Sequence, residues 1–159
     1  MNTIILYSNI IEDLFIHADR NMVMTILRNF VSNAIKFTKR EGQIVLDAKE
    51  NENEIRISVN DTGIGIDKEN ISKLFRIDSA YSTKGTEKEK GTGLGLIISK
   101  EFAEKNNGRI EVKSEAGKGS TFTLKIPIRE SENDSRFEIR DSKLKSRVSN
   151  LFIYAKDTC

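Results

Sequence analysis

The chain has 159 residues, of which 37% are hydrophobic and 31% charged, and its formal net charge at pH 7 is +2. This length suffices for one domain with a buried core, while the small charge and the lack of a basic run interleaved with aromatic residues argue against nucleic-acid binding. The single cysteine, Cys159, excludes an internal disulfide and a cysteine metal cage. No segment resembles a signal peptide or a membrane span, so we expect a cytoplasmic domain without direct membrane contact.

Two segments near the start, TIILYS and LFIHA, are rich in strand-forming residues. We predict one or two short strands there, followed by a helix that Asp19 caps. Across residues 19–38, apolar side chains recur at helical spacing and form one broad face. The residues of this face are Val23, Ile26, Leu27, Phe30, Val31, Ala34 and Ile35.

The same predicted helix has a polar edge. Asn29, Asn33 and Lys36 stand at i, i+4 and i+7, so two amides and an ammonium group line up along the helix. Such an edge suits a polar ligand, although solvated side chains would produce the same pattern. This helix by itself leaves both interpretations open.

Two further strands, GQIVLDA and EIRISVND, are predicted after the helix. The second alternates apolar and polar residues, with its odd positions assigned to the core: Ile55, Ile57 and Val59. Asp61 is the next odd position, so its carboxylate is predicted to point inward, where burial requires a partner.

A first glycine box, which we define as residues 61–66 (D-T-G-I-G-I), begins at this aspartate. Gly63 and Gly65 permit tight turning and the close approach of a flat ligand to the backbone. An inward acceptor beside such a slot suits the exocyclic amine of adenine. The alternative is a capped turn before a helix that begins near Asp67.

Residues 78–90 have mixed charge and few large apolar side chains, so we expect a mobile segment. This segment is either a plain surface loop or a ligand lid, in which case Lys84 is a candidate phosphate contact. A second glycine box, residues 91–96, follows and opens a helix; it consists of Gly91, Thr92, Gly93, Leu94, Gly95 and Leu96. Glycines there let phosphates reach backbone N–H groups at the positive end of the helix dipole. The spacing matches neither a Rossmann fingerprint nor a P-loop.

The helix after the second glycine box is predicted to bury one stripe, made by Leu94, Ile97, Ile98 and Phe102. Beyond it, RIEVKS and STFTLKIP form a predicted hairpin across a glycine-containing turn. Ser120 shares strand parity with Phe122, so its hydroxyl is predicted to face inward. We place the domain at residues 1–128, and a polar linker with a short amphipathic helix at residues 129–159.

Four features stand in a fixed order: Asn29 with Asn33, the first glycine box, the second glycine box, and Gly119-Ser120-x-Phe122. The chain resembles the ATP-binding catalytic domain of bacterial sensor histidine kinases. The resemblance is carried by these four features and by the segments NFVSNAIKFT, NDTGIGI and KGTGLGLIISKEFAEKNNGRIEVKSEAGKGSTFTLKIP. That family belongs to the GHKL superfamily, which also includes gyrase B, MutL and large heat-shock chaperones. The resemblance covers about four fifths of the chain, from Ile4 to Pro127.

The resemblance implies an α+β fold: a two-layer α/β sandwich of the Bergerat type, with a mixed, mostly antiparallel sheet and helices on one face. It also implies ATP and Mg²⁺ as cofactors. Asn33 would ligate the Mg²⁺ with Asn29 beside it, Lys36 would neutralise phosphate charge, Asp61 would accept the adenine amine, and Ser120 would help hold the base. The full set of nucleotide-binding residues so implied is Asn33, Lys36, Phe37, Asp61, Gly63, Gly65, Ile66, Lys84, Gly91, Thr92, Gly93, Leu94, Gly95, Leu96 and Ser120.

Within the superfamily, the hydrolases and serine kinases typically carry a glutamate base at the position of Asn29. Because Asn29 cannot act as a base, the resemblance favours phosphate transfer to histidine, with Asn29, Asn33 and Lys36 as the catalytic residues. His17, the only histidine, lies in a predicted strand and lacks the exposed helical setting of a phosphoacceptor. We therefore expect a fragment of a longer kinase, which can itself be membrane-anchored; the less favoured alternative is a stand-alone subunit that acts on a histidine in a partner.

The expected partners are phosphoacceptor and dimerisation helices of the parent kinase and, indirectly, a response regulator. We expect the isolated chain to be monomeric or weakly associating. The alternative function is a non-catalytic nucleotide-binding module that regulates a partner by lid movement.

Overall fold

The computed structural model describes residues 5–10, 14–76, 94–128 and 136–139. Five strands form the main sheet in the order β1-β3-β4-β6-β5. Their bounds are β1 Ile5–Ile10, β3 Gln43–Glu50, β4 Glu54–Asp61, β5 Arg109–Glu115 and β6 Gly119–Pro127. Strand β1 runs parallel to β3 and the other neighbours are antiparallel, so the sheet is mixed and mostly antiparallel, as predicted.

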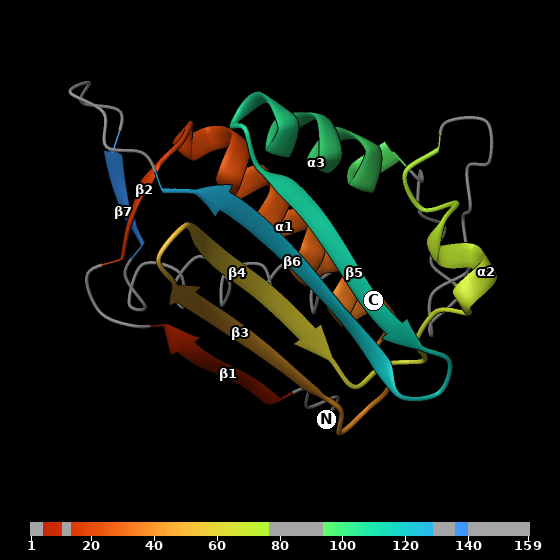
Figure 1. Cartoon of the computed structure of the whole chain (residues 1–159). Coiled ribbons are helices and arrows are strands. Elements are labelled where there is room, and N and C mark those ends of the chain that lie inside the picture. The colour runs from red at the N-terminus through yellow and green to blue at the C-terminus, as the bar shows by residue number, and fades with distance from the viewer. Residues whose placement is uncertain (1–4, 11–13, 77–93, 129–135, 140–159) are drawn as a thin grey trace.

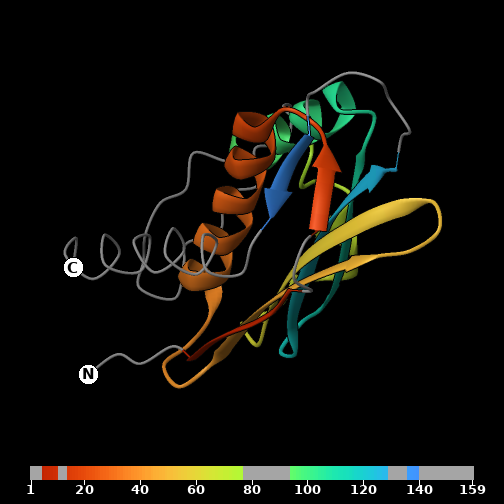
Figure 2. The same ribbon diagram turned by 90° about the vertical axis from the view of Figure 1, so that its left-hand side faces the viewer.

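Helices α1 (Arg20–Phe37) and α3 (Leu94–Lys105) cover one face of this sheet (Figures 1 and 2). The short helix α2 (Lys68–Ile71) lies beside the end of β5. Strand β2 (Leu14–His17) stands apart from the main sheet and pairs antiparallel with β7 (Arg136–Ile139). The predicted α+β two-layer sandwich with helices on one face is therefore confirmed. Among these helices, none has both the length and the apolar character needed to cross a membrane.

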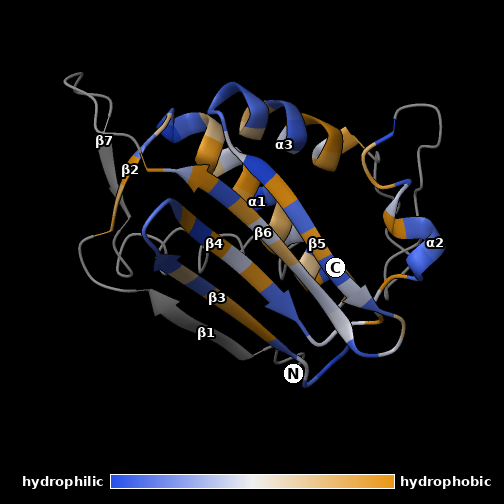
Figure 3. Cartoon of the chain, in the orientation of Figure 1, coloured by the Kyte–Doolittle hydropathy of each residue, from blue (hydrophilic) through white to orange (hydrophobic). Residues whose placement is uncertain are grey.

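The core lies between the helical layer and the inner face of the sheet. The alternation of apolar and polar residues along β4 and β6 is visible in Figure 3, and the odd positions of β4 are buried as predicted. The apolar face of α1 packs onto this surface, where the rings of Phe30 and Phe122 approach to 5.4 Å between centroids. The largest fully buried side chains are Phe30, Ile16, Ile26, Leu27, Ile44, Leu46, Ile57, Leu124, Ile126, Val23 and Val31.

Helix α1 begins and ends as its sequence predicts. Asp19 is the N-cap, and its Oδ1 accepts the backbone N–H of Met22 at 2.9 Å. By contrast, the helix predicted after Asp67 is only the four-residue α2, and the Asp67 side chain makes no capping hydrogen bond.

The buried stripe of α3 differs from the prediction. Leu94 is 51% exposed and Ile98 39% exposed, whereas Ser99 and Ala103 are buried. Gly95, Ser99 and Ala103 stand at i, i+4 and i+8, so small residues share one face of the helix. A Cβ added to Gly95 would lie 3.4 Å from Cγ of Asn29, which shows how closely α3 approaches α1. The prediction was wrong for Leu94 and Ile98 because the close approach of α3 to α1 requires small residues at the contact, whatever their hydrophobicity.

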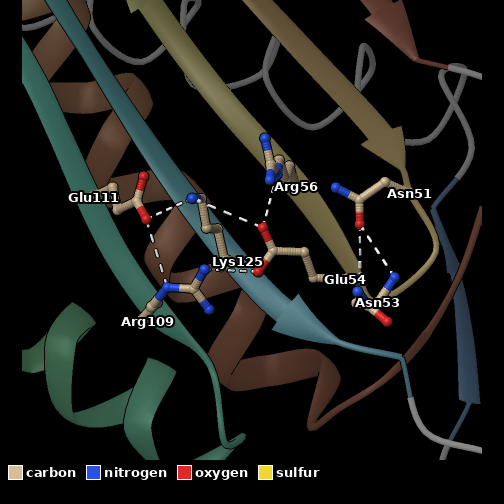
Figure 4. Close-up of polar contacts among 7 residues, drawn as sticks. All are labelled: Asn51, Asn53, Glu54, Arg56, Arg109, Glu111 and Lys125. Atoms are coloured by element: carbon tan, nitrogen blue, oxygen red, sulfur yellow. Dashed lines mark hydrogen bonds and ion pairs between the residues drawn. The ribbon is translucent and has the colours of Figure 1, made fainter.

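The outer face of the sheet carries an ion network over β4, β5 and β6 (Figure 4). Glu54 accepts hydrogen bonds from Arg56 Nε at 2.7 Å and from Arg109 Nη2 at 2.8 Å, and Lys125 Nζ lies 3.7 Å away. Glu111 pairs with Lys125 and with Arg109. Burial raises the pKa of Glu54, but the two arginine hydrogen bonds and the nearby positive charges outweigh it, so the pKa lies below its ordinary value. These residues join three strands on the face of the sheet opposite to α1 and α3.

Candidate functional site

Asp61 is the last residue of β4, and strand parity turns its carboxylate into the core, as predicted. The residue is only 4% exposed, and Oδ1 accepts the backbone N–H of Gly63 at 2.8 Å and of Ser120 at 3.3 Å. Burial raises the pKa of Asp61, and these two hydrogen bonds lower it in part. None of the hydrogen bonds within the described ranges uses Oδ2, so this oxygen is left to accept a hydrogen bond from a ligand.

The first glycine box runs between the end of α1 and the β5–β6 hairpin. Ile64 N–H donates to the carbonyl of Phe37 at 3.1 Å, and Gly117 N–H donates to the carbonyl of Ile64 at 2.7 Å. A Cβ on Gly63 would lie 2.4 Å from the Phe37 oxygen, and one on Gly65, whose φ is +69°, would lie 2.0 Å from the Glu115 oxygen. The neighbouring backbone therefore requires glycine at both positions, whether or not a ligand also approaches them.

Ser120 stands directly beside Asp61 at the start of β6. The two residues are register partners, and the preceding Gly119 has a φ of +106° that brings its α-carbon close to the Asp61 carbonyl. Ser120 is 8% exposed, on the inner side that its parity predicted.

Ser114 on β5 belongs to this cluster, and the sequence reasoning missed it. Its Oγ accepts the backbone N–H of Ile66 at 2.8 Å and lies 2.9 Å from both the Gly119 oxygen and Ser120 Oγ. Ser114 and Ser120 are register partners across the hairpin. The predicted strand segments RIEVKS and STFTLKIP end and begin at these two serines, and this was the available signal.

The polar edge of α1 contacts the start of α3. The amide nitrogen of Asn29 donates to the Gly95 carbonyl at 2.9 Å and to Ser99 Oγ at 3.0 Å. Because a carbonyl only accepts, this contact fixes which end of the Asn29 amide faces α3. Asn33, one turn further along α1, is half-buried, and none of the hydrogen bonds within the described ranges uses its side chain. Lys36 Nζ lies 5.2 Å from the centroid of the Phe37 ring.

The structure thus brings several predicted residues together around α1. Phe37 meets Gly63, Asn29 meets Gly95, and Ile66 joins the serine pair beside Asp61. Leu96 packs against the core, whereas Leu94 is exposed. Four predicted residues lie outside the described ranges: Lys84, Gly91, Thr92 and Gly93.

A metal ion at this site would need ligands other than a protein carboxylate cage. Within the described ranges, no group of three or more histidine, cysteine, aspartate or glutamate side chains could hold one. Mg²⁺ usually keeps several waters and is bound through substrate phosphates and one or two protein oxygens. The amide oxygen of Asn33, with phosphates of a nucleotide, fits this requirement.

The sequence profile of the family described as histidine kinase-, DNA gyrase B- and HSP90-like ATPases matches residues 18–130. The chain belongs to this family. The match spans α1, both glycine boxes and the β5–β6 hairpin, and family membership makes the chain an ATP-binding domain.

Several relatives within the family are sensor kinases. The chain is 38% identical over 129 residues to the sensor histidine kinase WalK of Bacillus subtilis, covering 77% of this chain and 20% of WalK. It is 40% identical over 113 residues to the sensor protein SrrB of Staphylococcus aureus, covering 69% of this chain and 19% of SrrB. The chain thus spans about a fifth of the length of these relatives.

Solved structures agree with the fold. The nucleotide-free catalytic domain of the histidine kinase ThkA matches with a TM-score of 0.67 and 31% identity, over 78% of this chain and 80% of that one. The full-length ShkA structure with AMPPNP matches with a TM-score of 0.65 and 30% identity, over 79% of this chain and 26% of ShkA. The fold is therefore that of a histidine kinase catalytic domain.

Proposed function

We propose that this domain binds MgATP beside α1 and transfers the γ-phosphate to a histidine on a phosphoacceptor domain outside this chain. The observation that carries the proposal is the state of Asp61, a buried carboxylate with Oδ1 occupied by two backbone N–H groups and Oδ2 left for a ligand. In this role Oδ2 accepts the exocyclic amine of adenine. Gly63, Gly65, Ile66 and Ser120 surround the base.

The phosphate end lies along the remaining part of α1. Asn33 ligates Mg²⁺ through its amide oxygen and Lys36 offsets phosphate charge. Asn29 contributes differently, since its amide nitrogen already holds the first turn of α3. This contact positions Leu94, Gly95 and Leu96, the described end of the second glycine box. Lys84, Gly91, Thr92 and Gly93 complete the proposed phosphate contacts.

Histidine is the favoured acceptor because Asn29 stands where related hydrolases and serine kinases typically carry the glutamate that activates water or a hydroxyl. Asn29 cannot take a proton, whereas a neutral imidazole is already a nucleophile. In-line transfer then depends on positioning and on charge stabilisation by Mg²⁺ and Lys36.

The proposed partners are phosphoacceptor helices and, after transfer, a response regulator. Support for the regulator comes from the structure of ThkA in complex with the response regulator protein TrrA, which matches this chain with 27% identity and a TM-score of 0.65 over 82% of this chain.

Incubation of the chain with an isolated phosphoacceptor domain, Mg²⁺ and γ-labelled ATP tests the transfer. We expect an acid-labile label on the acceptor, lost with Asn33→Ala and retained with the control Asn60→Ala, which changes an exposed residue on the outer face of β4. ATP binding without any label on histidine would instead favour the non-catalytic regulatory module.

A further inference from the structure

A hydroxyl contact between β5 and β6 bears on how the site tells one purine from another. Ser114 Oγ has three polar neighbours at hydrogen-bond distance: Ile66 N at 2.8 Å, the Gly119 carbonyl at 2.9 Å and Ser120 Oγ at 2.9 Å. A serine hydroxyl has one proton to donate and two lone pairs that accept.

Only one arrangement of protons makes all three contacts hydrogen bonds. The Ile66 N–H can only donate and the Gly119 carbonyl can only accept, so Ser114 accepts from the first and gives its proton to the second. No proton is then left on Ser114 for Ser120. The Ser120 hydroxyl must therefore donate to Ser114.

We propose that Ser114 is a positioning residue that holds the Ser120 hydroxyl as an acceptor toward the base and thereby selects purines with an amine at position 6. This inference rests on the proposed function. With the Ser120 proton directed at Ser114, the two side-chain oxygens that the proposed site offers to the base, Ser120 Oγ and Asp61 Oδ2, both act as acceptors. An amine, or a water held by it, supplies the required protons, whereas a 6-carbonyl presents another lone pair.

The location of the contact supports a role in recognition. Ser120 is 8% exposed and its backbone N–H donates to Asp61 Oδ1, so the two acceptors are adjacent. Ser114 also fastens the first glycine box through Ile66 N–H. If Ser114 had only a structural role, its replacement would weaken the binding of all nucleotides alike. A change in the preference for one base over another would instead show that the direction of the Ser120 hydroxyl matters.

The test compares ATP with ITP, which replaces the 6-amine by a carbonyl. Dissociation constants for both are measured by calorimetry with Mg²⁺ for the wild type, Ser114→Ala, Ser114→Thr, Ser120→Ala and the Ser114→Ala/Ser120→Ala double variant, with thermal unfolding as a folding check. In Ser114→Ala the Ser120 hydroxyl is free to turn and donate to the 6-carbonyl. We expect the preference for ATP over ITP to fall by about threefold to tenfold, the range for one neutral hydrogen bond. Ser114→Thr, which keeps the hydroxyl, should retain the preference.

The double variant identifies the route of the effect. If Ser114 acts through Ser120, Ser114→Ala has no effect on the ATP-to-ITP ratio once Ser120 is alanine. An unchanged ratio in Ser114→Ala alone, or an equal change in the Ser120→Ala background, overturns the inference while leaving ATP binding intact. A wild-type chain that does not bind ATP overturns the proposed function instead, and this inference with it. If Ser114→Ala does not fold, Ser114→Cys, with a far weaker hydrogen-bonding group, replaces it.

Discussion

The backbone N–H of Ile64 donates to the carbonyl of Phe37 at 3.1 Å, which fastens the first glycine box to the last residue of α1. Phe37 is one turn beyond Asn33, and Ile64 is three residues beyond Asp61. This single contact therefore fixes the position of the polar edge of α1 relative to the buried carboxylate of β4. The two halves of the proposed nucleotide site are held in one packed unit.

The first prediction concerns the charge of Asp61. Asp61→Asn keeps an oxygen for the N–H groups of Gly63 and Ser120 but presents an NH₂ group to the adenine amine. We expect the dissociation constant for ATP to rise at least about tenfold, with the melting temperature little changed. Asp47→Asn, on the outer face of β3, is the matched control, and calorimetry is the measurement. Unchanged affinity in Asp61→Asn would make Asp61 a structural turn residue.

The second prediction concerns pH. Burial raises the pKa of Asp61 above its ordinary 3.8, and the proton competes with the adenine amine for the same carboxylate. Affinity for ATP should therefore fall as the pH drops through this raised pKa, earlier than for an exposed aspartate. Because the phosphates also titrate, the comparison is between wild type and Asp61→Asn across a pH series. If Asp61→Asn lost ATP affinity at low pH in the same way as the wild type, the loss could not be assigned to protonation of Asp61.

The third prediction concerns the ion network on the outer face. The pKa values of Glu54 and Glu111 lie below their ordinary 4.5, so their ionised forms stabilise the fold fully above about that pH. This stabilisation is lost as the pH falls through the lowered folded-state pKa values.

We therefore expect Glu54→Gln to lower the free energy of unfolding by about 1–3 kcal/mol at pH 7, measured in urea, and by less at pH 3. Glu52→Gln, in the exposed turn between β3 and β4, serves as the control and should leave the free energy of unfolding unchanged at both pH values. An equal loss for Glu54→Gln at both pH values would show that packing rather than charge is responsible.

The fourth prediction separates two glycines of one hairpin. Gly117 and Gly119 both have positive φ, +83° and +106°, but a Cβ on Gly117 meets nothing within 4 Å, whereas one on Gly119 would lie 1.9 Å from the Asp61 carbonyl. Gly117→Ala should cost only the backbone strain, about 1 kcal/mol. Gly119→Ala should cost about 3 kcal/mol or more and also weaken ATP binding, because β6 must move away from Asp61. Equal melting temperatures for the two variants would refute this distinction.

Local chemistry made much of the fold predictable. The Asp19 cap and the helical spacing after it predicted α1, and strand alternation correctly turned Asp61 inward. Both rest on short-range periodicity, which a single sequence contains. The family resemblance supplied the sandwich, which periodicity alone does not specify.

The features that escaped prediction depend on contacts between distant segments. Leu94 and Ile98 are exposed because of how closely α3 approaches Asn29, and the hydrophobic pattern of the sequence does not predict that distance. The three contacts of Ser114 require the hairpin register and the return of Ile66 at the same time. The assignment of Mg²⁺ to Asn33 remains a prediction.

The pairing of β2 with β7 has a practical consequence for anyone who shortens this protein. The family match ends at residue 130, yet β2, whose Leu14 and Ile16 are buried in the core, takes its only strand partner within the described ranges from residues 136–139. Ending the chain at residue 130 while keeping β2, which itself precedes the family match, would leave the backbone of β2 without β7, and unpaired edges invite association with other chains. We expect a version ending at residue 130 to be more prone to aggregate than one that retains residue 139.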